Sequence, residues 1–290
     1  MPPVSGSLLE RPPPPGPLAC GQPAIGRSAA APDVPAPGPN PTAPAARLPH
    51  ILPLGDTALT VDFGDVIDPE LNRAVLALEQ AVAAAELPGV LETVPSYRAL
   101  MVLYDPTEIG FDPLAARLRA LLANPGWVAV RPGTGWIVPV CYAPPFGLDS
   151  DELGATLGLG AERLAALHAR ACYNVYMVGF APGFTYLGGL DPALAIPRRA
   201  TPRPEVPAGS VMVGGRQAAI VSVPIPTGWY VLGRTPLLAF DPDRPNPFLF
   251  RPGDTVRFRP VPPCEYAALA ALPAAELAVL AREPLPCPAS

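Results

Sequence analysis

The spacing of apolar residues divides the chain into an N-terminal part of alternating strands and helices and a later part of short strands. Between residues 50 and 145 the pattern predicts a small α/β domain with the order β-α-β-β-α-β, the split βαβ or ferredoxin-like arrangement. Asp68 and Pro69 are expected to be the N-cap and first residue of the first helix, because both residue types favour helix starts. The expected elements are a strand-like segment at 51–63, a helix from 69, strands at 90–94 and 99–104, a helix from 112, and a strand at 136–142.

The second half changes character after a helical stretch at 150–170. From Cys172 onward, short apolar runs alternate with glycine and proline, which is typical of a compact all-β barrel or sandwich. We therefore expect a β-barrel domain with leading helices at 146–262. A short helical tail at 263–290, divided at Pro273, is expected to follow.

The composition changes sharply near residue 50. Residues 1–49 hold 15 of the 46 prolines and only 7 valine, leucine and isoleucine residues. Such a segment buries too little apolar surface to offset the entropy lost on ordering. We therefore expect 1–49 to be a disordered or polyproline-like tail.

Charge and composition exclude several classes of function. All 20 basic residues are arginine, so chemistry that needs a lysine, such as a Walker A phosphate site or a Schiff base, is excluded. The net charge of −5 argues against a nucleic-acid binder. Five cysteines without a CxxC pair fit neither a zinc site nor a disulfide framework, and we expect a reduced, cytoplasmic protein without a metal. Residues 171–190 are uncharged, but Pro182 and several glycines argue against a membrane helix.

The basic charge is concentrated in the β-rich half. Residues 197–260 contain 9 arginines and 4 acidic residues, whereas residues 50–196 contain 7 arginines and 16 acidic residues. Prolines stiffen the segment around Arg198 and Arg203, so these two side chains could be held in place to bind an anion. The alternative is that individual arginines are surface residues paired with the acidic half of the chain.

Two further residues allow more than one interpretation. His168 lies near the end of a predicted helix, where it is either a general acid/base or, more commonly, a structural residue. Trp229 either stacks on a substrate or, as we expect, fills the barrel core.

The second half resembles a known family in its ordered motifs. The runs GFAPGFTYLGGL, PRRATPRPEVPAGSVMVGGRQ, PTGWYVLGRT, FDP and RPGDTVRF, all between 179 and 258, resemble the allophanate hydrolase subunit 1 family. That family includes the B component of the bacterial ATP-dependent 5-oxoprolinase and the Kip-type inhibitor of a histidine kinase. The resemblance implies an α+β fold, in which a cyclophilin-like all-β barrel follows the ferredoxin-like domain.

The resemblance also implies an activity and partners. It implies a hydrolase complex that opens 5-oxo-L-proline to L-glutamate with ATP, in which this chain is active only with other subunits. The expected partners are a homologous second subunit, which resembles allophanate hydrolase subunit 2 or the C component of 5-oxoprolinase, and a third subunit that resembles its A component. No nucleotide-binding motif is visible, so the ATP site is expected at an unfamiliar position or on another subunit.

The candidate site residues are the positions that match the family's motifs: His168, Arg198, Arg203, Gln217 and Arg234. The roles we assign are a proton shuttle for the histidine, anion binding for the arginines, and a hydrogen bond to an amide or lactam for the glutamine.

Two departures from the family's pattern keep other functions open. They lie at Thr227 and at Ile220–Val223. A carboxyltransferase-like or allophanate-hydrolase-like subunit that acts on another amide is one alternative. A Kip-type regulator that binds and inhibits a sensor histidine kinase is the other.

Overall fold

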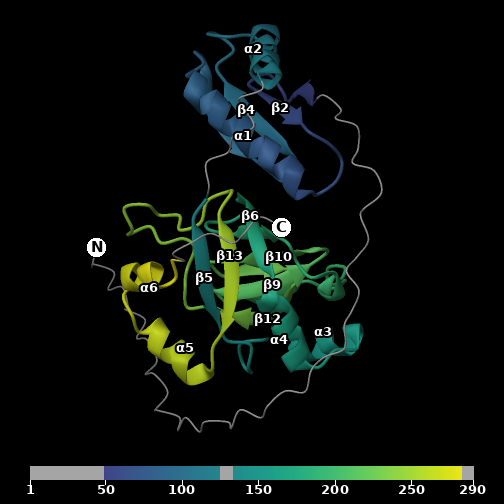
Figure 1. Ribbon diagram of the computed structural model, residues 1–290, viewed down its shortest axis with the longest axis vertical. Coiled ribbons are helices and arrows are strands. Elements are labelled where there is room, and N and C mark those ends of the chain that lie inside the picture. The colour runs from purple at the N-terminus through teal and green to yellow at the C-terminus, as the bar shows by residue number, and fades with distance from the viewer. Residues whose placement is uncertain (1–48, 125–132, 283–290) are drawn as a thin grey trace, which may run out of the picture. The chain divides into compact units, whose positions relative to one another are not determined.

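The computed structural model describes residues 49–124 and 133–282 (Figure 1). By their contacts, the described residues belong to one compact unit. The tail expected at 1–49 lies outside the described residues, apart from Pro49.

A four-stranded antiparallel sheet forms the first part of the fold. Its strands run in the order β1-β2-β4-β3, and two helices pack against it. The helix start was predicted correctly, because Asp68 Oδ1 accepts hydrogen bonds from the backbone N–H groups of Glu70 (2.8 Å) and Leu71 (3.3 Å). The elements are β1 (His50–Pro53), β2 (Ala58–Asp62), α1 (Pro69–Ala85), β3 (Val90–Pro95), β4 (Ala99–Tyr104) and α2 (Phe111–Ala123).

The last strand expected for this domain belongs to the second sheet instead. The strand β5 (Gly135–Val140) pairs in parallel with β13 (Thr255–Pro260), so the prediction of a β-α-β-β-α-β sheet was wrong at its final strand. In the first sheet it is β1 that pairs with β2. The physical reason lies in the burial pattern. The strand β4 alternates between buried and partly exposed positions, whereas β5 is buried at five of its six positions, as in a strand covered on both faces.

The second sheet has seven strands in the order β12-β9-β10-β7-β6-β13-β5. Its two edges meet where Cys141 and Arg234 exchange two backbone hydrogen bonds of 2.9 Å, so the sheet curls back on itself at this point. The remaining strands are β6 (Cys172–Val178), β7 (Thr185–Gly188), β9 (Ser210–Gly214), β10 (Gln217–Ile220) and β12 (Tyr230–Arg234), with a separate pair, β8 (Arg203–Val206) and β11 (Ile225–Thr227).

Short helices surround this sheet. The helical stretch expected at 150–170 is two helices, because Gly158 takes a left-handed conformation and ends the first of them. The expected C-terminal helices are present and are divided at Pro273. The helices are α3 (Ser150–Leu157), α4 (Ala161–Arg170), the short 3₁₀ turn η2 (Pro192–Leu194), α5 (Pro263–Ala270) and α6 (Ala274–Leu280).

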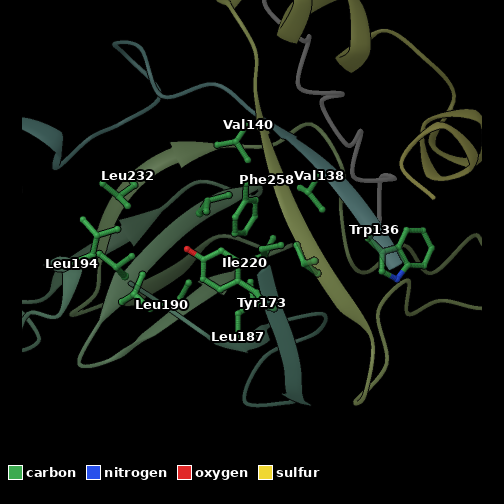
Figure 2. Close-up of a cluster of buried hydrophobic side chains, with 14 of the residues drawn as sticks. Trp136, Val138, Val140, Tyr173, Leu187, Leu190, Leu194, Ile220, Leu232 and Phe258 are labelled. Carbon is green, nitrogen blue, oxygen red and sulfur yellow. The ribbon is translucent and has the colours of Figure 1, made fainter. Parts of the chain in front are cut away.

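The interior of the curled sheet is a packed apolar core. Figure 2 shows Val138, Tyr173, Ile220 and Phe258 converging from β5, β6, β10 and β13. The architecture is therefore mixed α and β. The cyclophilin-like assignment and the domain boundaries at 145 and 262 stay predictions. No helix in the described ranges is long and apolar enough to cross a membrane.

His168 lies inside this core. It is fully buried, its Nδ1 is 2.8 Å from the Tyr142 hydroxyl, and its ring stacks on Phe258 at 4.4 Å. Its Nε2 makes no hydrogen bond within the described residues. Burial lowers the pKa of His168 to about 3, because a charged imidazolium would have no compensation there.

A buried carboxylate holds the loop at 197–203 in place. The side chain of Asp149, which precedes α3, is fully buried. It accepts hydrogen bonds from Arg199 Nη1 (2.8 Å), from Arg203 Nε (2.9 Å) and from the Val231 backbone N–H (2.8 Å). One carboxylate thus ties the loop at 197–203 to strand β12 and to the start of α3.

We predict that Asp149→Ala lowers the free energy of unfolding by about 3–5 kcal/mol, because it leaves two guanidinium groups and a buried N–H without their partner. Glu152, which is half exposed and contacts Arg199 at 2.5 Å, provides the control. Glu152→Ala is expected to cost less than about 1 kcal/mol. Urea unfolding of both variants measures the difference, and equal losses would contradict the anchoring role of Asp149.

We predict that His168 makes the protein less stable in acid. Its pKa is about 3 in the folded chain and 6.5 in the unfolded chain, so its contribution is complete above pH 6.5 and is lost as the pH falls towards 3. The stability difference between the wild type and His168→Gln should therefore change by up to about 1.4 kcal/mol per pH unit below that point.

The matched control is His50→Gln, because His50 is exposed on β1. The free energy of unfolding of the three proteins is measured from about pH 7 down to about pH 4. A wild-type to His168→Gln difference that stays constant over this range would show that His168 is not held neutral by burial.

Candidate functional site

A second cluster of buried side chains lies on the face of the second sheet that points away from its core. Alternation along the strands assigns the faces: Ala218 and Ile220 belong to the core, so Gln217 and Ala219 face the other way. The same alternation places Tyr186 beside this second cluster rather than in the core. We call this side, with its aromatic residues Tyr97, Phe184, Tyr186 and Trp229, the aromatic face.

Trp229 is held against the backbone of β9. It is 4% exposed, and its backbone N–H donates a hydrogen bond to Thr227 Oγ1 at 3.1 Å, which fixes the turn that precedes Trp229. A Cβ on Gly214 would lie 2.9 Å from the indole Cδ2 of Trp229, so only glycine permits this contact without movement. Thr227, one of the departures from the family's pattern, is therefore a buried structural residue of this face.

The two neighbouring arginines have different environments. Arg199 is bound by Asp149 and Glu152, and its backbone N–H donates to Gly228 O at 2.7 Å. That bond places Arg198 beside Trp229, with its guanidinium carbon 5.4 Å from the ring centroid. Arg198 is exposed, and it forms no ion pair with any residue that the structure describes. It is thus a fixed cation available to an anion.

Gln217 is a buried amide whose nitrogen lacks a partner in the described part of the chain. It is 8% exposed, and its Nε2 makes no hydrogen bond there. An unsatisfied buried donor costs about 1–3 kcal/mol, so the site gains when a ligand supplies an acceptor. Ser222, the polar residue of the other departure, is by contrast satisfied, because it accepts hydrogen bonds from the N–H groups of Ala239 (2.8 Å) and Phe240 (3.2 Å).

Tyr97 links Gln217 and Arg198. It lies on the turn between β3 and β4, and its ring meets those of Tyr186 at 5.7 Å and Tyr176 at 5.9 Å. Burial raises the pKa of Tyr97 well above its usual range, while Gln217 and Arg198 act in the opposite direction. The phenol is therefore a neutral hydrogen-bond donor near neutral pH, and both Gln217 and Arg198 lie close enough to act on it.

The other three predicted residues lie elsewhere. The guanidinium of Arg203 is bound to Asp149, and Nε of Arg234 donates to Ala208 O at 2.8 Å where the sheet curls back. His168 is in the core, where its contacts are with Tyr142, Tyr173 and Phe258. The structure thus places Arg198 and Gln217 on the aromatic face around Trp229, whereas the contacts of Arg203, Arg234 and His168 lie elsewhere.

Sequence reasoning missed part of the aromatic face. Tyr97 and Tyr186 lie far apart in sequence, and no local pattern indicates that the β3–β4 turn meets β7. Trp229 is buried as expected, but in the cluster of the aromatic face rather than in the core. The one usable signal was Gly228-Trp229 close to an arginine-rich, proline-stiffened segment.

A surface pocket lies apart from these residues. It is lined by Val178, Asn246, Pro247, Phe248, Phe250, Arg251 and Pro252. The lining is mostly apolar and includes none of the predicted site residues, so we do not place the chemistry there.

Metal and thiol chemistry add little to this picture. Within 49–124 and 133–282, no cluster of three or more His, Cys, Asp or Glu side chains is arranged to hold a metal ion. Cys141 is a buried thiol at the point where the sheet curls back.

Comparison with known proteins agrees with the resemblance seen in the sequence. The family model for the carboxyltransferase domain, subdomains C and D, matches residues 49–250. The B component of 5-oxoprolinase from Bacillus subtilis (strain 168) is 34% identical over 225 residues, which cover 74% of this chain and 94% of that protein.

Two solved structures are also similar. The crystal structure of TTHA0988 aligns with a TM-score of 0.63 and 39% identity over 70% of this chain, which spans only 40% of that longer chain. The crystal structure of the Kluyveromyces lactis urea carboxylase aligns with a TM-score of 0.64 over 77% of this chain and 22% of the urea carboxylase chain. The two sequences are 19% identical, so this similarity supports the fold alone. The chain therefore belongs to the family of carboxyltransferase domains, subdomains C and D, together with relatives named as the B component of 5-oxoprolinase.

Proposed function

We propose that the chain is a subunit of a 5-oxoprolinase-type complex, an ATP-dependent hydrolase that opens 5-oxo-L-proline to L-glutamate. Water adds across the lactam C–N bond, and ATP is split to ADP and phosphate. Relatives named as the B component of 5-oxoprolinase, similar over almost their full length, support the assignment to such a complex. The observation that assigns a binding site to this function concerns the residues around Tyr97. The amide nitrogen of the buried Gln217 has no hydrogen-bond partner among the described residues, and Arg198, held over Trp229, forms no ion pair with any of them.

These two groups match the chemistry of the substrate. The planar fork of an arginine binds a carboxylate with two parallel hydrogen bonds. An amide side chain carries both a donor and an acceptor, as does the edge of a lactam ring. A small ring with a carboxylate and a lactam therefore supplies what Arg198 and Gln217 lack.

The remaining predicted residues have other roles in this proposal. Arg203 is an anchor that compensates Asp149, and Arg234 holds the backbone where the edges of the sheet meet. His168 supports the core, because its fully buried ring is not accessible to a substrate. The role of proton shuttle, which we assigned to His168 from the sequence, therefore belongs to another group.

The complex needs more than this chain. The chain has no lysine, and no described loop has the spacing of a nucleotide-binding motif, so we place the ATP site on a partner protein. The partners are a homologous second subunit that resembles the C component of 5-oxoprolinase and a third that resembles the A component. A cytoplasmic location belongs to the same proposal.

The test is reconstitution from purified subunits. We expect this chain alone to release no ADP in the presence of 5-oxo-L-proline and ATP. We expect release that depends on 5-oxo-L-proline once both partners are added. A stable complex without turnover would contradict 5-oxo-L-proline as substrate and favour another amide. Failure to form any complex would contradict the subunit role and favour the regulator of a histidine kinase.

Two arginine substitutions should separate binding from anchoring in that complex. Arg198→Ala is expected to lower kcat/KM by about 10- to 100-fold with an unchanged melting temperature, because it removes one charged contact at an exposed position. Arg203→Ala is expected to lower the stability by about 1–3 kcal/mol, because Asp149 keeps only one guanidinium partner.

Arg216→Ala is the control for both variants, since Arg216 is exposed on the turn next to Gln217. It should change neither activity nor stability. If Arg198→Ala lost stability in proportion to its loss of activity, the side chain would be structural and the assignment of Arg198 to the substrate would be wrong.

A further inference from the structure

We infer that Tyr97 completes a binding site on the aromatic face, and that this site, made by Tyr97, Gln217, Arg198 and Trp229, takes a small cyclic amide that carries a carboxylate. The inference deepens the proposed function and rests on it, since it states which residues of this chain bind the substrate and which of them contact the lactam ring.

The Tyr97 turn is held in place by a buried amide in a helix. Asn72, in the first turn of α1, is 4% exposed, and its Nδ2 donates to the backbone oxygens of Ser96 (3.0 Å), Tyr97 (3.4 Å) and Tyr176 (3.3 Å). A polar side chain buried in a helix is costly unless it is hydrogen-bonded. Asn72 therefore ties the β3–β4 turn to strand β6 of the second sheet and acts as a positioning residue for Tyr97.

The rings around Tyr97 restrict where its hydroxyl can go. Tyr176 meets it edge-on at an interplanar angle of 89°, and Tyr186 at 79°. Asn72 fixes the backbone and these two contacts fix the ring.

Gln217 pairs with Gly214 across β10 and β9, and the Trp229 ring packs on Gly214, so the amide of Gln217 lies beside Trp229 on the same face. Tyr97 and Gln217 thus belong to one region of the aromatic face, with Tyr186 and Trp229 between them.

The polar end of a cyclic amide fits that region. Burial keeps the Tyr97 phenol protonated, so it donates a hydrogen bond to a carbonyl oxygen. Gln217 needs a partner for its buried amide nitrogen, and the lactam carbonyl is such an acceptor. A lactam oxygen can accept from both groups at once because it has two lone pairs.

The charged end fits Arg198. Its guanidinium is fixed over the Trp229 ring, and among the described residues no carboxylate neutralises it. Arg198 lies at the border of the same region, because the Trp229 ring beneath its guanidinium also meets the Tyr186 ring. The rings of Tyr186 and Trp229, 6.1 Å apart, provide the apolar surface against which a small flat ring packs.

Binding to the isolated full chain tests the inference, because every group of the site belongs to this chain. Calorimetric titration compares three probes: 5-oxo-L-proline, 2-pyrrolidinone, which lacks the carboxylate, and L-proline, which lacks the lactam carbonyl. We expect 5-oxo-L-proline to bind and each of the other two to bind at least about tenfold more weakly, because 2-pyrrolidinone leaves Arg198 without its carboxylate and L-proline leaves Gln217 and Tyr97 without their acceptor.

Substitutions then assign the contacts. Gln217→Met keeps the length of the side chain but removes the amide, and Tyr97→Phe removes only the hydroxyl. Each should weaken 5-oxo-L-proline binding by at least about tenfold with little change for L-proline. Gln217→Met should also leave the melting temperature unchanged or higher, because it removes an unsatisfied buried group. Arg216→Ala, at an exposed position one residue from Gln217, is the control and should bind as the wild type does.

The positioning role of Asn72 is tested by a double-mutant cycle. Asn72→Ala should weaken binding of 5-oxo-L-proline in the wild type but should have no further effect in a Tyr97→Ala background. A residue that only supports the fold would weaken binding by the same factor in both backgrounds, and that result would overturn its role.

Three results would overturn the inference. The full chain could fail to bind 5-oxo-L-proline, it could bind all three probes equally, or the Gln217 and Tyr97 variants could lose assembly with the partner proteins instead of ligand binding. The last result would make the aromatic face a docking surface.

Failure of the inference and failure of the proposed function are distinguishable. A reconstituted complex whose turnover survives both Gln217→Met and Tyr97→Phe would overturn the inference and leave the function standing. Selective binding by the chain without turnover in the complex would do the reverse.

Discussion

The arrangement of the site depends on the buried carboxylate of Asp149. A fully buried carboxylate must be compensated by charge and by hydrogen bonds, and Arg199, Arg203 and the Val231 N–H provide them. By holding Arg199, the carboxylate fixes the loop at 197–203, and the Arg199 N–H then bonds to Gly228 beside Trp229. Arg198 is directed to the aromatic face as a consequence, where its charge can meet a ligand.

This division of the arginines explains how one basic segment serves both stability and recognition. Two guanidinium groups are bound inside the fold, and the third is exposed and held over an aromatic ring. Gln217 complements it as a buried amide whose donor is unused within the described residues. A site that leaves one cation and one donor unsatisfied gains most from a ligand with an anion and an acceptor at fixed separation, and a carboxylated lactam is such a ligand.

The sequence predicted most elements but not their partners. Asp68-Pro69 correctly marked the start of α1, because capping is a local interaction. The strand at 135–140 was predicted as a strand but placed in the wrong sheet. Its pairing with β13 joins residues more than a hundred positions apart, and only its continuous burial pointed to a covered strand.

The site shows the same limit. Arg198 and Gln217 were identified by motif, but the motif could not show that Arg203 would be neutralised by Asp149. Nor could it show that His168 would be buried or that Tyr97 would come from the other sheet. These contacts depend on packing between residues far apart in the sequence, and the local pattern of apolar residues does not indicate such packing.

The measurement that tests this account most directly is the NMR response of assigned side chains to 5-oxo-L-proline in the full chain. The Gln217 side-chain amide and the Trp229 indole N–H should shift together as the ligand is added, while the imidazole of His168 in the core should not respond. Shifts confined to the pocket around Phe248, or no shift at Gln217 when the ligand saturates, would contradict a binding site on the aromatic face.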